Sequence, residues 1–162
     1  MQFLTLAGAI GLFAVIAYGD LRKRRIPNTL ALGVAILGLT RILLAHDPAA
    51  ASEALAAASI TFAGMFLLFC GGMIGGGDAK LVAATALLVG PHELPRFLLS
   101  MSVCGGLLGL AMLLQDQVRT RKILGTASVN HIAGSTDTTV PYGVAVAAAG
   151  VISLVLEAPL AR

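Results

Sequence analysis

Two aspartates, Asp20 and Asp78, are the residues of this sequence best suited to chemistry. Asp20 directly follows an apolar run over residues 2–19, and Asp78 lies just before another over residues 81–90. A charged side chain at the centre of a helix in a bilayer costs about 2.5 to 3.5 kcal/mol on insertion scales, so carboxylates beside apolar runs are functional candidates. Two carboxyl groups close together do not both ionise readily, so one keeps its proton. The ionised group can take a proton from water while its protonated partner donates one to a carbonyl, which predicts acid–base hydrolysis of a peptide bond.

Each aspartate also has an interpretation that leaves chemistry out. Asp20 could be a solvated residue at a helix end, paired with a nearby arginine. Asp78 could be the N-cap of the following helix, because an Asp side chain accepts hydrogen bonds from the first N–H groups and complements the helix dipole. A capping role for Asp78 is compatible with catalysis.

A group of glycines precedes Asp78: Gly71, Gly72, Gly75, Gly76 and Gly77. Glycine allows close backbone approach and positive φ. We therefore expect an irregular segment that admits substrate backbone and water beside Asp78, with close helix packing as the alternative. A phosphate-binding loop would need a preceding strand and a Lys-Ser/Thr pair, and the sequence has neither here.

Neither a metal nor another cofactor is predicted. Cys70 and Cys104 fall inside apolar runs, and no metal-ligand spacing is present. His131 lies in a polar segment on the same predicted membrane side as the aspartates, but a lone histidine is rarely a ligand.

The composition indicates a membrane protein rather than a soluble domain. Hydrophobic residues make up 57% of the chain and charged residues 12%, whereas a soluble domain is about a quarter charged. A spanning helix needs about 20 apolar residues. The sequence predicts a single all-α domain over residues 1–162, a polytopic membrane protein with six transmembrane helices. The six apolar runs cover residues 2–19, 27–45, 54–73, 81–90, 97–114 and 140–156. The second contains Arg41 near its far end, and the fourth is expected to be short or broken.

The basic residues orient these helices. Eight of the eleven fall in the loops after the first, third and fifth runs: Arg22, Lys23, Arg24, Arg25, Lys80, Arg119, Arg121 and Lys122. Cytoplasmic loops carry the excess of Lys and Arg, so the N-terminus is expected outside and the polar loop of about residues 115–139 in the cytoplasm. Both aspartates then lie at the cytoplasmic face. Charge that flanks apolar runs argues against nucleic-acid binding, and the cluster at 22–25 could contact anionic lipid.

Three motifs in this sequence resemble those of the type IV prepilin peptidase family. Residues 20–28 (DLRKRRIPN) are similar to the family's first aspartate motif. Residues 75–81 (GGGDAKL) resemble the second, which carries the GxGD pattern of intramembrane aspartyl proteases. Residues 140–145 (VPYGVA) resemble its late proline–tyrosine–glycine motif. The short chain and the Ile-Pro-Asn variant look like the peptidase-only form that serves tight-adherence (Flp-type) pili, with archaeal preflagellin-type peptidases as near relatives.

The resemblance implies an aspartyl endopeptidase of the inner membrane that removes the basic leader from prepilins and pseudopilins at the cytoplasmic face. Asp20 and Asp78 match the family's catalytic pair. Seven further positions match motif residues expected to bind substrate or shape the site: Gly75, Gly77, Lys80, Pro27, Asn28, Pro141 and Tyr142. Longer family members have an additional cysteine-bearing cytoplasmic region and also methylate the new N-terminus. This sequence has no such region, so methyltransferase activity is not expected.

Two other functions fit an apolar chain with membrane carboxylates. A proton-coupled transporter or channel would also use them, together with a glycine-broken helix. Transport, however, needs polar groups near the bilayer midplane, and both aspartates are predicted at one end. A non-catalytic scaffold for pilus assembly would need neither aspartate to titrate. The sequence does not indicate an oligomeric state.

Overall fold

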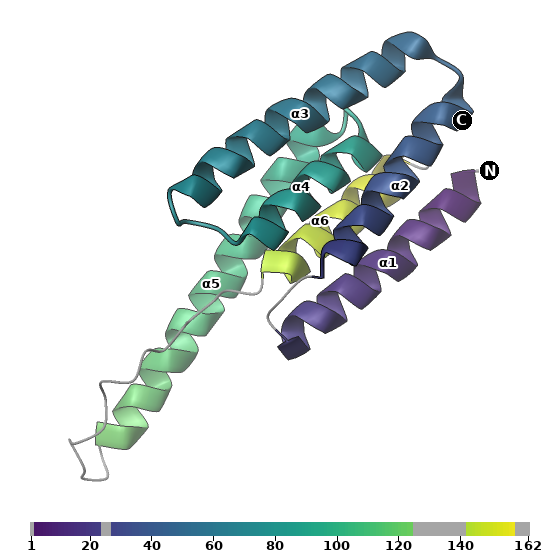
Figure 1. The fold of residues 1–162 in the computed structure, drawn as a ribbon. Coiled ribbons are helices and arrows are strands. Elements are labelled where there is room, and N and C mark those ends of the chain that lie inside the picture. Colours follow the sequence, from purple (N-terminus) through teal and green to yellow (C-terminus); the bar gives the residue numbers. More distant parts are fainter. Residues whose placement is uncertain (1, 24–26, 125–141, 158–162) are drawn as a thin grey trace.

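The computed structural model describes residues 2–23, 27–124 and 142–157, and these residues form helices joined by short connections. The helices are α1 (Gln2–Lys23), α2 (Asn28–Ala45), α3 (Pro48–Cys70), α4 (Gly76–Val89), α5 (Leu94–Leu124) and α6 (Tyr142–Glu157) (Figure 1). No strand occurs within these described ranges, so the all-α prediction is confirmed there.

Four of the helices are long and apolar enough to cross a membrane. These stretches are Thr5–Arg22, Asn28–Ala45, Pro48–Cys70 and Leu94–Gln115. The apolar helix α6 is shorter, with 16 residues. The helix α4 has 14 residues, and at 1.5 Å per residue it spans about 21 Å, less than the roughly 30 Å of a bilayer core. The short fourth helix was therefore expected correctly, while six spans and an external N-terminus stay predictions.

Two helices extend beyond the apolar runs that predicted them. The third run was placed at residues 54–73, but α3 begins at Pro48, where Asp47 accepts hydrogen bonds from the N–H groups of Ala49 at 2.9 Å and Ala50 at 3.3 Å. Hydropathy missed residues 48–53 because they include Pro48, Ser52 and Glu53, whereas the Asp-Pro pair is a helix-start pattern. At the other end of the chain, α5 continues to Leu124, so residues 115–124 of the expected polar loop are helical, and residues 125–139 lie outside the described ranges.

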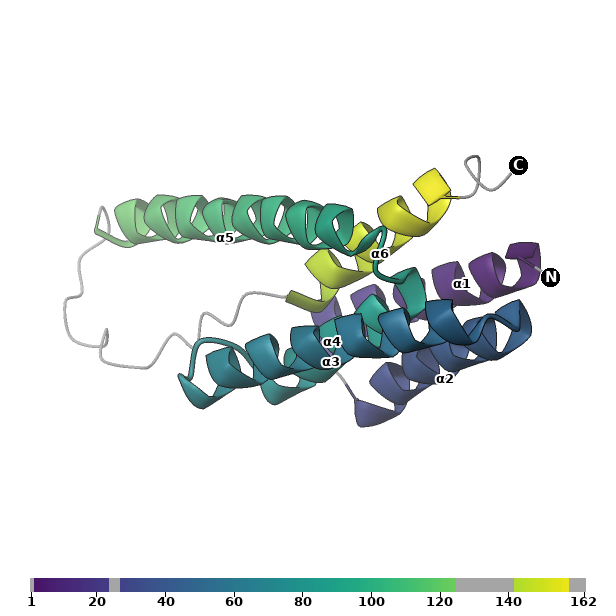
Figure 2. The ribbon, with the colours of Figure 1, turned by 90° about the horizontal axis from the view of Figure 1, so that it is seen from above.

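The short helix α4 occupies the interior of the bundle. It packs mainly against α2 and α3, and also against α6, while α1 packs on α6 and α6 on α5. Figure 2 shows α5 extending past the other helices at one end. Eight residues of α4 are buried: Ala79, Leu81, Val82, Ala84, Thr85, Ala86, Leu88 and Val89. The outer helices instead expose large apolar side chains, among them Ile60 and Leu67 on α3 and Leu99 and Leu107 on α5, which is the arrangement expected where lipid covers the surface.

Candidate active site

Asp20 lies in the last turn of α1 with its side chain facing the bundle. It is only 5% exposed, whereas Tyr18 and Leu21 on the same turn are each 63% exposed. The helical period of 3.6 residues explains this difference, because neighbouring residues point in different directions around the axis. The interpretation of Asp20 as a solvated helix-end residue is therefore wrong. Arg22 donates a hydrogen bond to the Tyr18 hydroxyl at 2.9 Å on the exposed side of α1.

Asp78 lies in the first turn of α4 and is half-buried. The N-cap of α4 is Gly75, so Asp78 is three positions further along and is not itself the N-cap. From that position its carboxylate accepts a hydrogen bond from the backbone N–H of Gly75, as the acidic member of a capping box does. The sequence-based N-cap assignment was thus wrong by three residues, although Asp78 does help to cap the helix.

The two carboxyl groups act on one another across the bundle. The pKa of Asp78 is raised from 3.8 to about 6. Burial is the largest cause, the negative charge of Asp20 adds to it, and the hydrogen bond from Gly75 opposes the rise. Asp78 lies on α4, which is not among the four helices long enough to span a membrane. Because the charge of Asp20 affects the pKa of Asp78, the carboxyl groups of α1 and α4 lie within electrostatic reach of one another, as the dyad hypothesis requires.

The glycines before α4 make room for the Asp78 carboxylate and for a close helix contact. A Cβ atom on Gly75 would lie 2.9 Å from Asp78 Oδ2, and a Cβ on Gly76 would lie 3.1 Å from the Phe69 ring on α3. Gly72 has a φ of +69° in the turn between α3 and α4, a conformation that glycine adopts without strain. Gly77 lies in the first turn of α4 and is half-buried. The irregular turn and the close packing are thus both present, while the admission of substrate and water beside Asp78 stays a prediction.

The remaining motif residues cluster at helix starts. Lys80 Nζ on α4 donates a hydrogen bond to Asn28 Oδ1 at the start of α2, at 3.3 Å. Pro27 precedes α2 in an extended conformation, and its carbonyl accepts a hydrogen bond from the N–H of Leu30 at 3.0 Å. Tyr142 begins α6, and a Cβ on Gly105 of α5 would lie 3.6 Å from its ring. Pro141 lies outside the described residues. The contact of Lys80 with Asn28 thus joins two of the motifs directly.

Among the described residues, no three His, Cys, Asp or Glu side chains gather as a metal site would require. Cys70 is exposed at the end of α3, and Cys104 is half-buried in α5. His131 lies outside the described ranges. Within the described residues, the candidate active site is the aspartate pair together with the glycine turn before α4.

Comparison with known protein families decides what kind of protein carries this pair. The model of the type IV leader peptidase family matches residues 7–110, well over half of the chain. The chain belongs to the type IV leader peptidase family. The matched range of this peptidase includes both aspartates, the glycines before α4 and Lys80, while the motif at 140–145 lies beyond it. No curated protein and no solved structure matches the chain.

Family membership and the apolar helices together make this a multi-pass membrane peptidase. Membership in a peptidase family favours the peptidase hypothesis over the transporter and scaffold alternatives.

One polar residue of the peptidase was not recognised from the sequence as part of any arrangement. Arg41 interrupts the apolar run of α2, and its guanidinium contacts both α4 and α6 at the end away from Asp78. A charged residue within an apolar span is itself a signal of function or of a buried partner. The partner could not be read from the sequence, because it comes from two helices that are distant along the chain.

Proposed function

We propose that this peptidase is an aspartyl endopeptidase in which Asp20 and Asp78 form the catalytic pair. The observation that supports it best is the electrostatic coupling of two carboxyl groups held on different helices, one of them almost completely buried. Such a pair holds one proton between its members over a range of pH. The lack of a side chain on Gly75 makes room for the Asp78 carboxylate itself.

The proposed reaction needs no metal and no covalent intermediate. The ionised carboxylate accepts a proton from a water molecule, and the resulting hydroxyl attacks the carbonyl carbon of the scissile bond. The protonated carboxyl donates its proton to the carbonyl oxygen. The tetrahedral intermediate then collapses with proton transfer to the leaving amine, which regenerates a singly protonated pair. The apparent titration belongs to the pair, so neither residue is assigned as the sole acid.

The proposed substrates are type IV prepilins and pseudopilins, with Flp-type pilins as the specific class. Such a substrate has a basic leader followed by an apolar helix, so its cleavage site lies where the membrane meets the cytoplasm. The excess of basic residues around the end of α1, near the start of α4 and after the apolar part of α5 supports placing the aspartates at that face of the inner membrane. Methylation of the product and nucleic-acid binding have no part in the proposal.

Co-expression with a prepilin that carries its leader tests the pair. Asp20→Asn and Asp78→Asn should each reduce cleavage by at least about a thousandfold, because each removes one half of the proton transfer. The measurement is the ratio of processed to unprocessed pilin on a gel, with membrane abundance of each variant measured in parallel. Processing by either variant at a rate near that of the unmodified peptidase would disprove the dyad.

A matched control is available in Asp47, the N-cap of α3. Asp47→Asn makes the same chemical change, and Asn caps helices as well as Asp does, so prepilin should still be processed at the normal rate. A chelator should have no effect. Activity that a chelator abolishes and zinc restores would indicate a metallopeptidase instead.

A further inference from the structure

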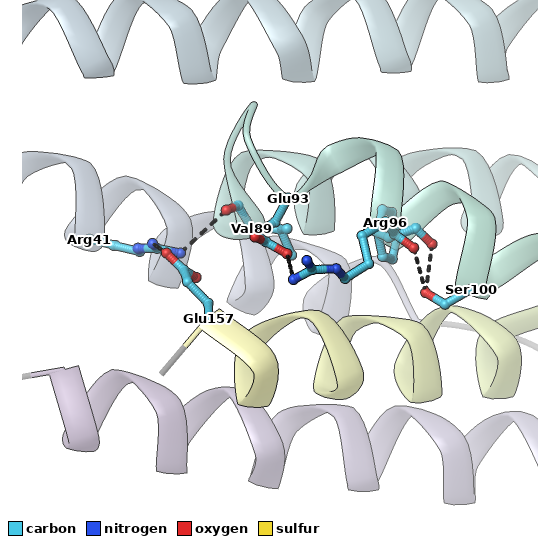
Figure 3. Close-up of polar contacts among 7 residues, drawn as sticks. Arg41, Val89, Glu93, Arg96, Ser100 and Glu157 are labelled. Atoms are coloured by element: carbon cyan, nitrogen blue, oxygen red, sulfur yellow. Dashed lines mark hydrogen bonds and ion pairs between the residues drawn. The ribbon is translucent and has the colours of Figure 1, made fainter. Parts of the chain in front are cut away.

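Arg41 connects three helices at the end of the bundle away from the aspartate pair. Its Nη1 atom donates to the carbonyl oxygen of Leu88 at 2.6 Å and to that of Val89 at 3.5 Å. Its Nη2 atom pairs with Glu157 Oε1 in the last turn of α6. Figure 3 shows the guanidinium of Arg41 between the end of α4 and Glu157.

The contacts of Arg41 with Leu88 and Val89 lie at the C-terminus of α4, the shortest of the described helices. The last carbonyls of a helix have no partner within the helix and carry partial negative charge. Arg41 supplies donors to two of them on α4. Its own charge is balanced by Glu157, and the two side chains are 36% and 30% exposed. A partly exposed ion pair contributes little net stability. We therefore look for the role of Arg41 in the elements that it joins.

The backbone of α2 also touches α4 near the same place. A Cβ on Gly38 would lie 3.0 Å from the Leu88 nitrogen and 3.1 Å from its Cα atom. At the other end of the two helices, Lys80 contacts Asn28. The helix α4 is thus held to α2 at both ends, and through Arg41 it is also held to α6, on which α1 packs. Because an α-helix does not compress along its axis, a shift of Leu88 moves Asp78 by a similar amount.

We propose that Arg41 is a positioning residue that fixes the axial position of α4, and with it the placement of Asp78 relative to Asp20. This inference rests on the proposed catalytic pair. The guanidinium acts through α4 and not on the substrate, and Glu157 is the fixed point to which it holds the helix. A misplacement of a reacting group by about 1 Å can slow a reaction by about a hundredfold.

The test compares Arg41→Gln and Arg41→Lys in the purified full-length peptidase with a prepilin substrate. Arg41→Gln should lower kcat per folded molecule between about tenfold and a hundredfold while KM stays within about twofold, because geometry changes and binding does not. Arg41→Lys keeps a cation that donates to the same carbonyls and should recover part of kcat. Arg96→Gln is the control, because Arg96 pairs with Glu93 in the turn just before α5 and, among the described residues, its side chain makes no hydrogen bond or ion pair to another helix. It should leave kcat unchanged.

A second measurement does not depend on cleavage. In a chain with Cys70→Ala and Cys104→Ala, cysteines at positions 20 and 78 are bridged with a short bifunctional maleimide. Arg41→Gln should slow bridging at least about threefold, whereas Arg96→Gln should not. An unchanged bridging rate, or an unchanged kcat per folded molecule with only a loss of folded protein, would overturn the positioning role. Slower bridging, together with an unmodified peptidase that does not cleave prepilin, would refute the proposed function and leave the positioning of α4 intact.

Discussion

Asp20 and Asp78 are held in different ways, and the difference bears on the proposed chemistry. Asp20 is almost fully buried on the inner side of α1, whereas Asp78 is half-buried and accepts a hydrogen bond from the N–H of Gly75. Burial and the charge of Asp20 disfavour ionisation of Asp78, and the Gly75 hydrogen bond favours it. The first two effects dominate and raise the pKa of Asp78 to about 6, which brings it nearer to the range in which an acid–base group is most useful.

The raised pKa of Asp78 predicts a pH-dependent effect of Asp78→Asn on stability. A carboxyl group whose pKa rises on folding, here to about 6, stabilises the folded state when protonated and loses that contribution as pH rises through the folded value. Near pH 4 the variant and the unmodified peptidase should have similar Tm. Near pH 8 the variant should be more stable by about 1 to 2 kcal/mol, after allowance for solvent screening. Thermal unfolding in detergent at several pH values measures this, and a Tm difference that does not grow with pH would contradict it.

The same titration predicts a bell-shaped dependence of cleavage rate on pH. At low pH both carboxyl groups are protonated and no base is present; at high pH both are ionised and no acid is present. Burial and the Asp20 charge raise the pKa of Asp78 to about 6, so kcat/KM should decline as pH rises above that region. A rate that keeps increasing up to about pH 9 would indicate a different acid–base pair.

At the scale of the elements, α2 and α4 form the pair of helices on which the site depends. Their backbones approach closely at Gly38, where no side chain fits, and close contact at small residues is the usual means of helix association in lipid. Arg41 and Asn28 add polar contacts on either side of this point. The helix α2 therefore holds α4 by a close backbone contact and by polar contacts on either side of it.

Gly38→Ala and Gly64→Ala form a matched pair that tests this contact. Both glycines lie within apolar helices, but a Cβ on Gly38 would meet three backbone atoms of α4 at 3.0 to 3.2 Å, whereas a Cβ on Gly64 meets nothing within 4 Å. Gly38→Ala should destabilise the fold by about 1 to 3 kcal/mol and reduce cleavage. Gly64→Ala should be neutral or stabilise by up to about 1 kcal/mol, because Ala favours helix. Equal Tm values for the two variants would show that the α2–α4 contact is not tight.

At the scale of the whole molecule, the two ends of the bundle differ in the charged residues that they carry. Figure 1 shows the end of α1 and the turn between α3 and α4 at one end, and the turn between α2 and α3 at the other. The first end carries the aspartates and most of the basic residues, and the second carries the Arg41–Glu157 pair. The excess of Lys and Arg predicts that the aspartate end faces the cytoplasm.

Cysteine labelling tests this orientation. In a chain with Cys70→Ala and Cys104→Ala, Met73→Cys reports on the α3–α4 turn and His46→Cys on the α2–α3 turn, since both positions are exposed. A membrane-impermeant maleimide should label position 46 in intact cells and position 73 only after permeabilisation. The reverse pattern would invert the topology and place the aspartates on the wrong side for a cytoplasmic leader.

Local features of the sequence determined the class of protein and its candidate chemistry. Apolar runs of sufficient length predict helices because a chain in lipid must satisfy its backbone hydrogen bonds internally. The motifs around Asp20 and Asp78 indicated the peptidase family, which the family match confirms. The first turn of α3 could also have been found locally, from the Asp47-Pro48 pair.

Only the tertiary structure decided how these residues are held. The burial of Asp20, the capping contact of Asp78 with Gly75 and the contacts of Arg41 each depend on the direction in which a side chain points and on which helix lies opposite. Hydropathy and spacing do not contain that information, because it arises from the packing of helices far apart in the chain. The sequence therefore identified the aspartates, and the packing of α1, α2, α4 and α6 brought their carboxyl groups within reach of one another.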